Sequence, residues 1–233
     1  MRRRLLGDTH PDVALSLYLL SDALLKQGKF DEATRCTEPF LTPETSARPE
    51  SVHLRRTRAR IQARRSEFQA AAEDYWKILE LEPGNHWHYL QSAPLYAELG
   101  DWNRYRILSA RALEKFRGTA DHTIAERMAK ATLLEPDVLP DRETVDQWTA
   151  TALRAGADHQ YLPYIRLARG LFELRQGHWN AAADYVEKTL ANTGPSVAGL
   201  RDIQAWMVLA MARHRLGQLE QARERGGLRG GRR

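Results

Sequence analysis

Apolar residues recur along most of the chain at steps of three and four, the spacing at which residues share one face of an α-helix. Five short segments interrupt this pattern, each with a Gly or Ser followed two positions later by an apolar residue. Four of the five have Ala three positions further on. The segments begin at Gly28, Ser66, Gly100, Gly177 and Gly217. We predict that each segment is the turn of a helical hairpin.

The spacing of these turns predicts a repeat. Gly28 and Ser66 are 38 residues apart, Ser66 and Gly100 are 34 apart, and Gly177 and Gly217 are 40 apart. Gly100 and Gly177 are 77 residues apart, about twice the unit, so a degenerate hairpin is expected between them. Repeats of this period are typical of a solenoid, in which each hairpin stacks on its neighbours.

Residues 121–155 supply the degenerate hairpin. Asp121 can cap a helix that runs to about Leu134, and Asp141 can cap a second helix that runs to about Arg154. If this hairpin forms, its apolar positions should be largely buried. Those positions are Ala125, Met128, Ala129, Ala131 and Leu133 in the first helix, with Val145, Trp148 and Leu153 in the second.

Strand-like alternation is absent, so the predicted fold class is all-α. We expect about six hairpins and helix at more than roughly half of the residues, above the usual third. The expected organisation is an N-terminal basic segment (1–10), hairpin 1 (11–41), a linker (42–49), hairpin 2 (50–84), hairpin 3 (85–118), degenerate hairpin 4 (119–156), hairpin 5 (157–194), partial hairpin 6 (195–225) and a disordered basic tail (226–233).

The first hairpin shows how the element bounds are predicted. Pro11 is expected at the start of its first helix, and the second helix is expected from about Phe30 to Leu41. The predicted core face of the first helix consists of four leucines, Leu17, Leu20, Leu24 and Leu25. In the third hairpin, Pro94 should kink or shorten the helix that contains it.

Small residues lie midway along the first helix of most hairpins, opposite an Ala early in the second. Two helices approach closely only where both side chains are small. The predicted contacts are Ser21 with Ala33, Ala59 with Ala71, Gly170 with Ala182, and Ala210 with Ala222. The third hairpin departs from the pattern, with Ala93 opposite Tyr105. Together these positions resemble the tetratricopeptide repeat, which implies a right-handed superhelical solenoid that binds peptides or proteins in its concave groove.

Two finer resemblances extend this one. The segment Gly7-Asp-Thr-His-Pro11, with Ala14, looks like the start of a kinesin-light-chain-type repeat. Residues 86–224 look like the C-terminal repeat segment of large bacterial serine/threonine protein kinases, with matching stretches at Ala93-Pro-Leu95, Leu99-Gly-Asp101, Ala125-Glu-Arg127 and Leu209-Ala-Met-Ala212. The chain has no glycine-rich loop, His-Arg-Asp or Asp-Phe-Gly motif of a kinase domain. The resemblance therefore implies the non-catalytic scaffold part of such a protein.

Charge is concentrated at the two ends of the chain. The formal net charge is +5, from 35 basic and 30 acidic residues. Six arginines lie in the terminal segments, namely Arg2, Arg3, Arg4, Arg229, Arg232 and Arg233. Without them 29 basic residues face 30 acidic ones, a net charge of −1. The repeat array itself is near neutral, which argues against a helical-repeat nucleic-acid-binding protein, the main alternative.

No residue pattern predicts an enzyme, a cofactor or a metal site. The segment His86-Trp87-His88 offers two imidazoles, but side chains two positions apart on a helix point away from one another, and no third ligand is at suitable spacing. Apolar runs are too short to span a membrane, and the single cysteine, Cys36, excludes an internal disulfide. The expected location is the cytoplasm.

One basic stripe stands out as a candidate binding site. His53, Arg56, Arg60 and Arg64 follow one another at steps of three and four, so they share a helical face. By the register of the resembled repeat this face lines the groove, together with Tyr18 and Asp22 of the first hairpin. Arginine binds carboxylates bidentately, so the stripe predicts an acidic peptide or terminal carboxylate as partner. The alternative is a solvated charged face, because the helix also carries Arg55, Arg58 and Arg65.

Overall fold

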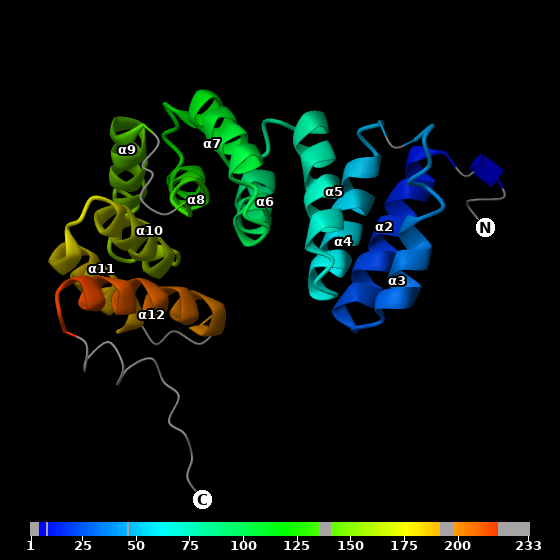
Figure 1. Cartoon of the computed structure of the whole chain (residues 1–233). Helices are drawn as coiled ribbons and strands as arrows, with labels where there is room; N and C mark the ends of the chain where they lie inside the picture. The colour runs from blue at the N-terminus through cyan, green and yellow to red at the C-terminus, as the bar shows by residue number, and fades with distance from the viewer. Residues whose placement is uncertain (1–4, 8, 46, 136–140, 192–197, 219–233) are drawn as a thin grey trace, which may run out of the picture. The chain divides into compact units, whose positions relative to one another are not determined.

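The structure is a computed structural model that describes residues 5–7, 9–45, 47–135, 141–191 and 198–218. Helix accounts for 74% of these residues, and none of them lies in a strand, which confirms the all-α prediction. The helices (Figure 1) are α2 (Pro11–Lys26), α3 (Phe30–Thr37), α4 (Ser51–Arg64), α5 (Phe68–Leu81), α6 (His86–Glu98), α7 (Trp102–Phe116), α8 (His122–Thr132), α9 (Arg142–Leu153), α10 (Leu162–Arg175), α11 (Trp179–Leu190) and α12 (Ala198–Arg215).

The chain divides into two compact units, Met1–Tyr105 and Arg106–Arg233, with the division inside α7. In unit 1, α2 packs on α3 and α4, and α5 packs on α4 and α6. Figure 1 shows α2 to α5 running side by side as two adjacent hairpins. In unit 2, α8 pairs with α9, α10 pairs with α11, and α12 packs on both α10 and α11. Each unit is therefore built from helical hairpins that pack on one another.

All five predicted turns have the same backbone geometry. The second residue after each helix lies in the left-handed region, with φ of 76° at Gly28, 61° at Ser66, 64° at Gly100, 79° at Gly177 and 74° at Gly217. The next amide donates to the carbonyl five residues back, at 2.9–3.0 Å in every case. This is the Schellman motif, which satisfies carbonyls that the helix end leaves unpaired. The prediction of five helix-ending turns is confirmed.

Of the five left-handed residues in these turns, only Ser66 has a Cβ atom. A left-handed backbone costs an L-residue roughly 1–2 kcal/mol. Ser66→Gly removes this strain, but Gly also has more backbone entropy in the unfolded chain, which opposes the gain. The net effect should be a rise of about 0.5–1 kcal/mol in the free energy of unfolding. Urea denaturation measures the change. The reciprocal variant Gly28→Ser is the control and should destabilise, since an added Cβ meets nothing within 4 Å there and only the backbone is strained. Equal effects of the two variants would contradict this account.

The small residues of the predicted close contacts are buried wherever both partners are described, and the approach of Gly170 to Ala182 is confirmed. Ser21, Ala33, Ala59, Ala71 and Ala182 are fully buried. Gly170 is buried as well, and a Cβ atom on it would lie 2.7 Å from Cγ2 of Val186 and 3.3 Å from the carbonyl oxygen of Ala182. Glycine is therefore required where α10 crosses α11.

The degenerate hairpin corresponds to α8 and α9. Asp121 Oδ1 accepts from the amides of Thr123 and Ile124 at 2.8 and 2.9 Å, and Asp141 Oδ1 accepts from that of Thr144 at 3.1 Å, so both predicted caps are confirmed. The predicted apolar positions are buried, except Leu153, which is half-buried. Tertiary contacts also hold α9, because the indole of Trp148 donates to the carbonyl of Phe116 at 2.8 Å.

Two predictions for the first hairpin were wrong. Helix α3 ends at Thr37, not near Leu41, because the chain turns to place Phe40 in a core with Ala14 and Leu54. The hydroxyl of Thr45, in the expected linker, then donates to the carbonyl of Phe40 and holds this turn.

Leu20 of the predicted core face is 52% exposed. The buried positions of α2 are instead Val13, Ala14, Ser21 and Leu25, with Leu17 and Leu24 half-buried. The face that packs is set by Ser21, the small residue at the helix contact, and not by the richest run of leucines.

Helix α6 continues through Pro94 to Glu98, so the proline does not shorten it. Several predictions lie outside the described residues. They concern the terminal arginines, the contact of Ala210 with Ala222 and the basic tail at 226–233.

Candidate functional site

The candidate residues lie on two neighbouring helices of unit 1. We call them the α2–α4 surface: Tyr18 and Asp22 on α2, with His53, Arg56, Arg60 and Arg64 on α4. Helices α2 and α4 contact each other along this side, so residues 30 or more positions apart in sequence come together. Two sets of contacts join the helices, one aromatic and one ionic.

The aromatic contact brings together Tyr18, His53 and Arg56. The rings of Tyr18 and His53 stack with centroids 5.0 Å apart and an interplanar angle of 28°. The guanidinium carbon of Arg56 lies 6.0 Å from the centroid of Tyr18, and its Nη2 lies 3.3 Å from His53 Nδ1. Loss of solvent and the charge of Arg56 lower the pKa of His53, so the neutral ring is favoured and Nδ1 can accept from Arg56.

The ionic contact joins Asp22 to two cations. Oδ1 of Asp22 lies 2.8 Å from Nη1 of Arg60, and Oδ2 lies 2.8 Å from Nζ of Lys26. The hydrogen bond from Lys26, aided by Arg60, lowers the pKa of Asp22 against the opposing effect of burial. Arg60 is therefore neutralised within the protein. The sequence analysis placed Asp22 and Arg60 on the same groove-lining surface, but it did not show that they form an ion pair.

Arg56 and Arg64 have no carboxylate partner among the residues that the structure describes. Arg64 is exposed and Arg56 is half-buried. The basic stripe of four thus reduces to two available guanidinium groups, flanked by the neutral His53–Tyr18 stack.

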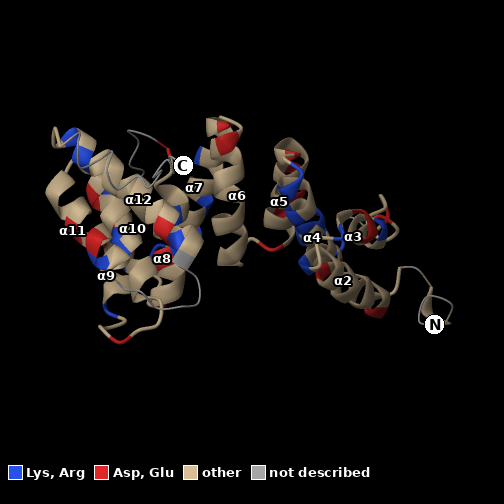
Figure 2. Ribbon diagram, turned by 90° about the horizontal axis from the view of Figure 1, so that it is seen from below, with Lys and Arg blue, Asp and Glu red and all other residues tan. Residues whose placement is uncertain are grey.

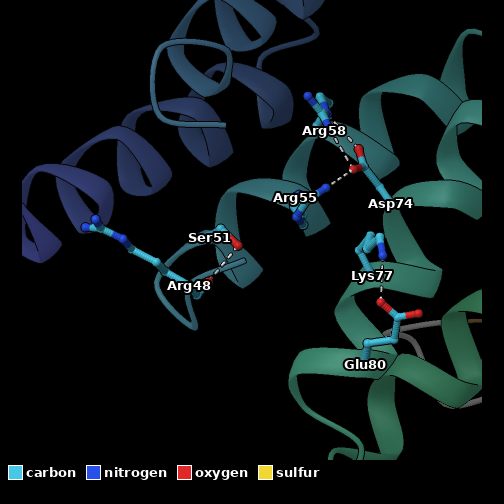
Figure 3. A network of polar contacts seen from close by, with 7 residues as sticks. All are labelled: Arg48, Ser51, Arg55, Arg58, Asp74, Lys77 and Glu80. Carbon is cyan, nitrogen blue, oxygen red and sulfur yellow. Dashed lines mark hydrogen bonds and ion pairs between the residues drawn. The ribbon is translucent and has the colours of Figure 1, made fainter. Parts of the chain in front are cut away.

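The other arginines of α4 serve the fold. Arg55 Nη1 lies 2.8 Å from Asp74 Oδ1, while Arg58 binds the same carboxylate bidentately, with Nε 2.6 Å from Oδ2 and Nη2 2.6 Å from Oδ1. Figure 3 shows both arginines reaching from α4 toward Asp74 on α5. Arg65 pairs with Asp31 of α3. Arg55 is only 7% exposed, so the side of α4 that faces α5 is not a solvated charged face.

Helix α4 therefore carries arginines of the α2–α4 surface on one side and arginines that bind Asp74 of α5 on the opposite side. Figure 2 shows basic positions recurring along α4 with acidic positions on the neighbouring helices. The sequence reasoning missed Asp74, although a signal was present. Asp74 follows Ala71 by three positions and precedes Ile78 by four, so it falls on the buried face of α5 and requires a partner there.

Buried polar groups border the site on α5 and α6. The Tyr75 hydroxyl donates to Gln91 at 3.2 Å, and burial raises the pKa of Tyr75 to about 12. The His88 side chain is fully buried, with Nε2 2.8 Å from Glu82. Burial lowers the pKa of His88, outweighing the carboxylate of Glu82, which acts in the opposite direction. His88 therefore serves as a neutral hydrogen-bond donor.

Unit 1 should lose stability as the pH falls below about 6.5. The folded chain lowers the pKa of both His53 and His88, so in that window the unfolded chain binds protons more readily. The free energy of unfolding is then highest above the ordinary histidine value and falls on acidification through the lowered values. Urea denaturation at about pH 7.5 and about pH 5.5 measures the loss. A variant carrying His53→Gln and His88→Gln should show a smaller loss, and an unchanged loss would exclude these two groups as its cause.

Among the described residues, no group of three or more His, Cys, Asp or Glu side chains could hold a metal ion. His86 stacks on Trp87 at 6.0 Å, whereas His88 is directed to Glu82, so the two imidazoles have different surroundings. Within the same described part of the chain, no helix is both long and apolar enough to cross a membrane.

The sequence model of the tetratricopeptide repeat family matches residues 18–86 and 167–225, together more than half of the chain. A search of curated proteins gave no match. A tetratricopeptide repeat protein from Parabacteroides merdae superposes with a TM-score of 0.60 at 16% identity, covering 91% of this chain and 76% of that one. A structure described as the functional characterization of Pseudomonas aeruginosa pilF gives a TM-score of 0.54 at 14% identity, covering 91% and 87%. A putative kinesin light chain with nearly identical repeats, from Podosopora anserina, gives 0.49 at 16% identity, covering 92% of each chain.

Proposed function

Because the chain belongs to the tetratricopeptide repeat family, whose repeats mediate protein–protein interaction, we propose that it is a scaffold that binds an acidic, extended peptide segment on the α2–α4 surface. The supporting observation is that Arg56 and Arg64 lack a carboxylate partner among the described residues, on a helix whose other arginines are paired. A guanidinium group without a carboxylate, next to a stacked aromatic pair, suits a carboxylate supplied by a partner.

The pairing within α4 also favours a peptide over nucleic acid. Nucleic-acid affinity comes mainly from many cations that neutralise phosphates. Arg55, Arg58, Arg60 and Arg65 are each bound to an aspartate of the same chain, so they do not form a continuous basic track. Two available arginines suit one or two carboxylates better than a phosphate backbone.

Mutation of the two available arginines tests this function. Arg56→Glu with Arg64→Glu should weaken binding of a library of blocked acidic peptides by about 100-fold or more, since both contacts are lost and two repulsive charges are added. Arg60 is left intact, because a carboxylate there would face Asp22 and disturb the fold. Fluorescence anisotropy at physiological salt measures affinity, and circular dichroism checks folding.

The matched control is Arg35→Glu, which reverses an exposed charge on α3 outside the α2–α4 surface. It should leave peptide affinity within about twofold. Tight binding of single-stranded RNA that is lost in the Arg56/Arg64 variant, with no peptide binding, would overturn the proposal in favour of the nucleic-acid alternative.

We also propose a bacterial signalling context in the cytoplasm, as the non-catalytic part of a serine/threonine kinase assembly. Support comes from the resemblance of residues 86–224 to the repeat segment of such kinases and from the single cysteine. The neighbouring DNA tests this proposal. An in-frame upstream kinase domain supports it, and a gene context without any kinase would remove its support.

A further inference from the structure

A cavity of about 290 Å³ adjoins the α2–α4 surface at the N-terminal ends of the two helices. It is lined by Pro11, Asp12 and Leu15 of α2 and by Pro49, Glu50 and His53 at the start of α4. His53 belongs to both sites, because its ring also stacks on Tyr18 and contacts Arg56. A ligand that crosses His53 would therefore reach the cavity and Arg56 together.

The cavity carries negative charge. Neither Asp12 nor Glu50 has an ion-pair partner among the described residues. Each helix start contributes about half a positive charge, so two carboxylates outweigh two helix dipoles by about one unit. The neighbouring basic side chains are directed elsewhere. His10 Nδ1 accepts from the amide of Asp12, and Arg48 Nη1 points at the carbonyl of Thr9, 3.5 Å away.

The walls between these carboxylates are apolar. Pro11 and Leu15 lie on one side and Pro49 on the other, and Leu15 is 48% exposed. A lysine side chain combines an apolar four-carbon stem with a terminal ammonium, and such side chains bury the stem while the charge stays near the rim. The apolar walls of the cavity suit the lysine stem, and its carboxylates suit the ammonium group.

We propose that the cavity receives a lysine of the same peptide whose carboxylate binds Arg56, so that the partner is recognised by a pair of opposite charges. This inference rests on the proposed function and narrows its partner class. The acidic peptide is not uniformly acidic. It carries a cation at the end that lies over Asp12 and Glu50.

The spacing of the two charges follows from helix geometry. Glu50 and Arg56 are six residues apart on α4, which at 1.5 Å per residue is about 9 Å. An extended peptide advances about 3.3 Å per residue, so its cation and its carboxylate should be about three residues apart. The expected motif is Lys-x-x-Glu, read in either chain direction.

A double-mutant cycle between peptide and protein tests the cavity. The probe is the blocked peptide Ala-Lys-Ala-Ala-Glu-Ala, and its analogues replace Lys with norleucine or Glu with Gln. The protein variant is Asp12→Asn with Glu50→Gln. Its control is Glu32→Gln with Glu67→Gln, which removes the same charge, and Glu67 is an N-cap residue without a side-chain cap bond, as Glu50 is. Affinities are measured by fluorescence anisotropy.

Norleucine should weaken binding about threefold to fivefold to the wild-type and control proteins, as expected for a partly exposed ion pair, and should have no effect on the Asp12/Glu50 variant. A peptide with Lys directly beside Glu should bind as weakly as the norleucine peptide. If replacing the peptide's Lys with norleucine has no effect while replacing its Glu with Gln abolishes binding, the cavity inference is overturned and the proposed function stands. If the Glu-to-Gln replacement has no effect while the norleucine replacement weakens binding, the assignment of Arg56 as the carboxylate-binding residue is overturned instead. If none of the peptides binds, both are overturned.

Discussion

Replacing Asp74 with Ala should lower the free energy of unfolding by about 3–5 kcal/mol, the largest effect that we expect from a single substitution in unit 1. Asp74 is 3% exposed, and its carboxylate binds the guanidinium groups of both Arg55 and Arg58. Removing it takes the Asp74 counter-ion away from Arg55, which is itself only 7% exposed. The cost comes from losing this counter-ion in a buried site, and it exceeds the net contribution of the ion pair.

The adjacent residue provides a matched control. Glu73 also pairs with an arginine, Arg104 at 2.6 Å, but its side chain is 52% exposed. Glu73→Ala should therefore cost less than about 1 kcal/mol. Urea denaturation followed by circular dichroism compares the two variants. Similar losses for Asp74→Ala and Glu73→Ala would show that the Asp74 cluster is no more than a surface ion pair.

Replacing Gly170 with Leu should destabilise unit 2 by about 1–3 kcal/mol, because α10 and α11 would have to separate. Even the first added atom would lie 2.7 Å from the Cγ2 of Val186, and the β-branched valine has little rotamer freedom in a helix. Val186→Ala in the same chain should recover part of the loss, and the thermal midpoint measures this coupling.

Gly199 is the control, because it is also helical but an added Cβ there meets nothing within 4 Å. Gly199→Leu should leave stability unchanged or raise it by up to about 1 kcal/mol. In unit 1, Ala71→Leu tests the equivalent contact with Ala59 and should also cost about 1–3 kcal/mol. Unchanged thermal midpoints for Gly170→Leu and Ala71→Leu would show that the helix register is wrong.

Local chemistry made the turns and caps predictable. A glycine that adopts positive φ after a helix, or an aspartate that caps the next one, acts within five residues of its own position. The turn at Gly177 and the cap at Asp121 were therefore visible in the sequence and are confirmed in the structure. The close approach at Gly170 was also readable, because it needs two small residues at fixed spacing from the turn.

Positions that depend on distant partners were harder to predict. Helix α3 ends early because Phe40 finds a core formed with Leu54, which belongs to another hairpin. Leu20 is exposed because Ser21 sets the contact face of α2. At the candidate site, helical periodicity placed Arg60 correctly on the shared face. It could not show that Asp22, 38 residues earlier, neutralises this arginine.

The central claim is that the partner binds to the α2–α4 surface of unit 1. Its most direct test is a nuclear magnetic resonance titration of the isotopically labelled full chain with the tightest-binding member of the acidic peptide library. The account predicts chemical-shift changes that cluster at Tyr18, His53, Arg56 and Arg64 and are absent in the Arg56→Glu, Arg64→Glu variant. Changes clustered on α8 to α12, or changes that persist in that variant, would contradict it.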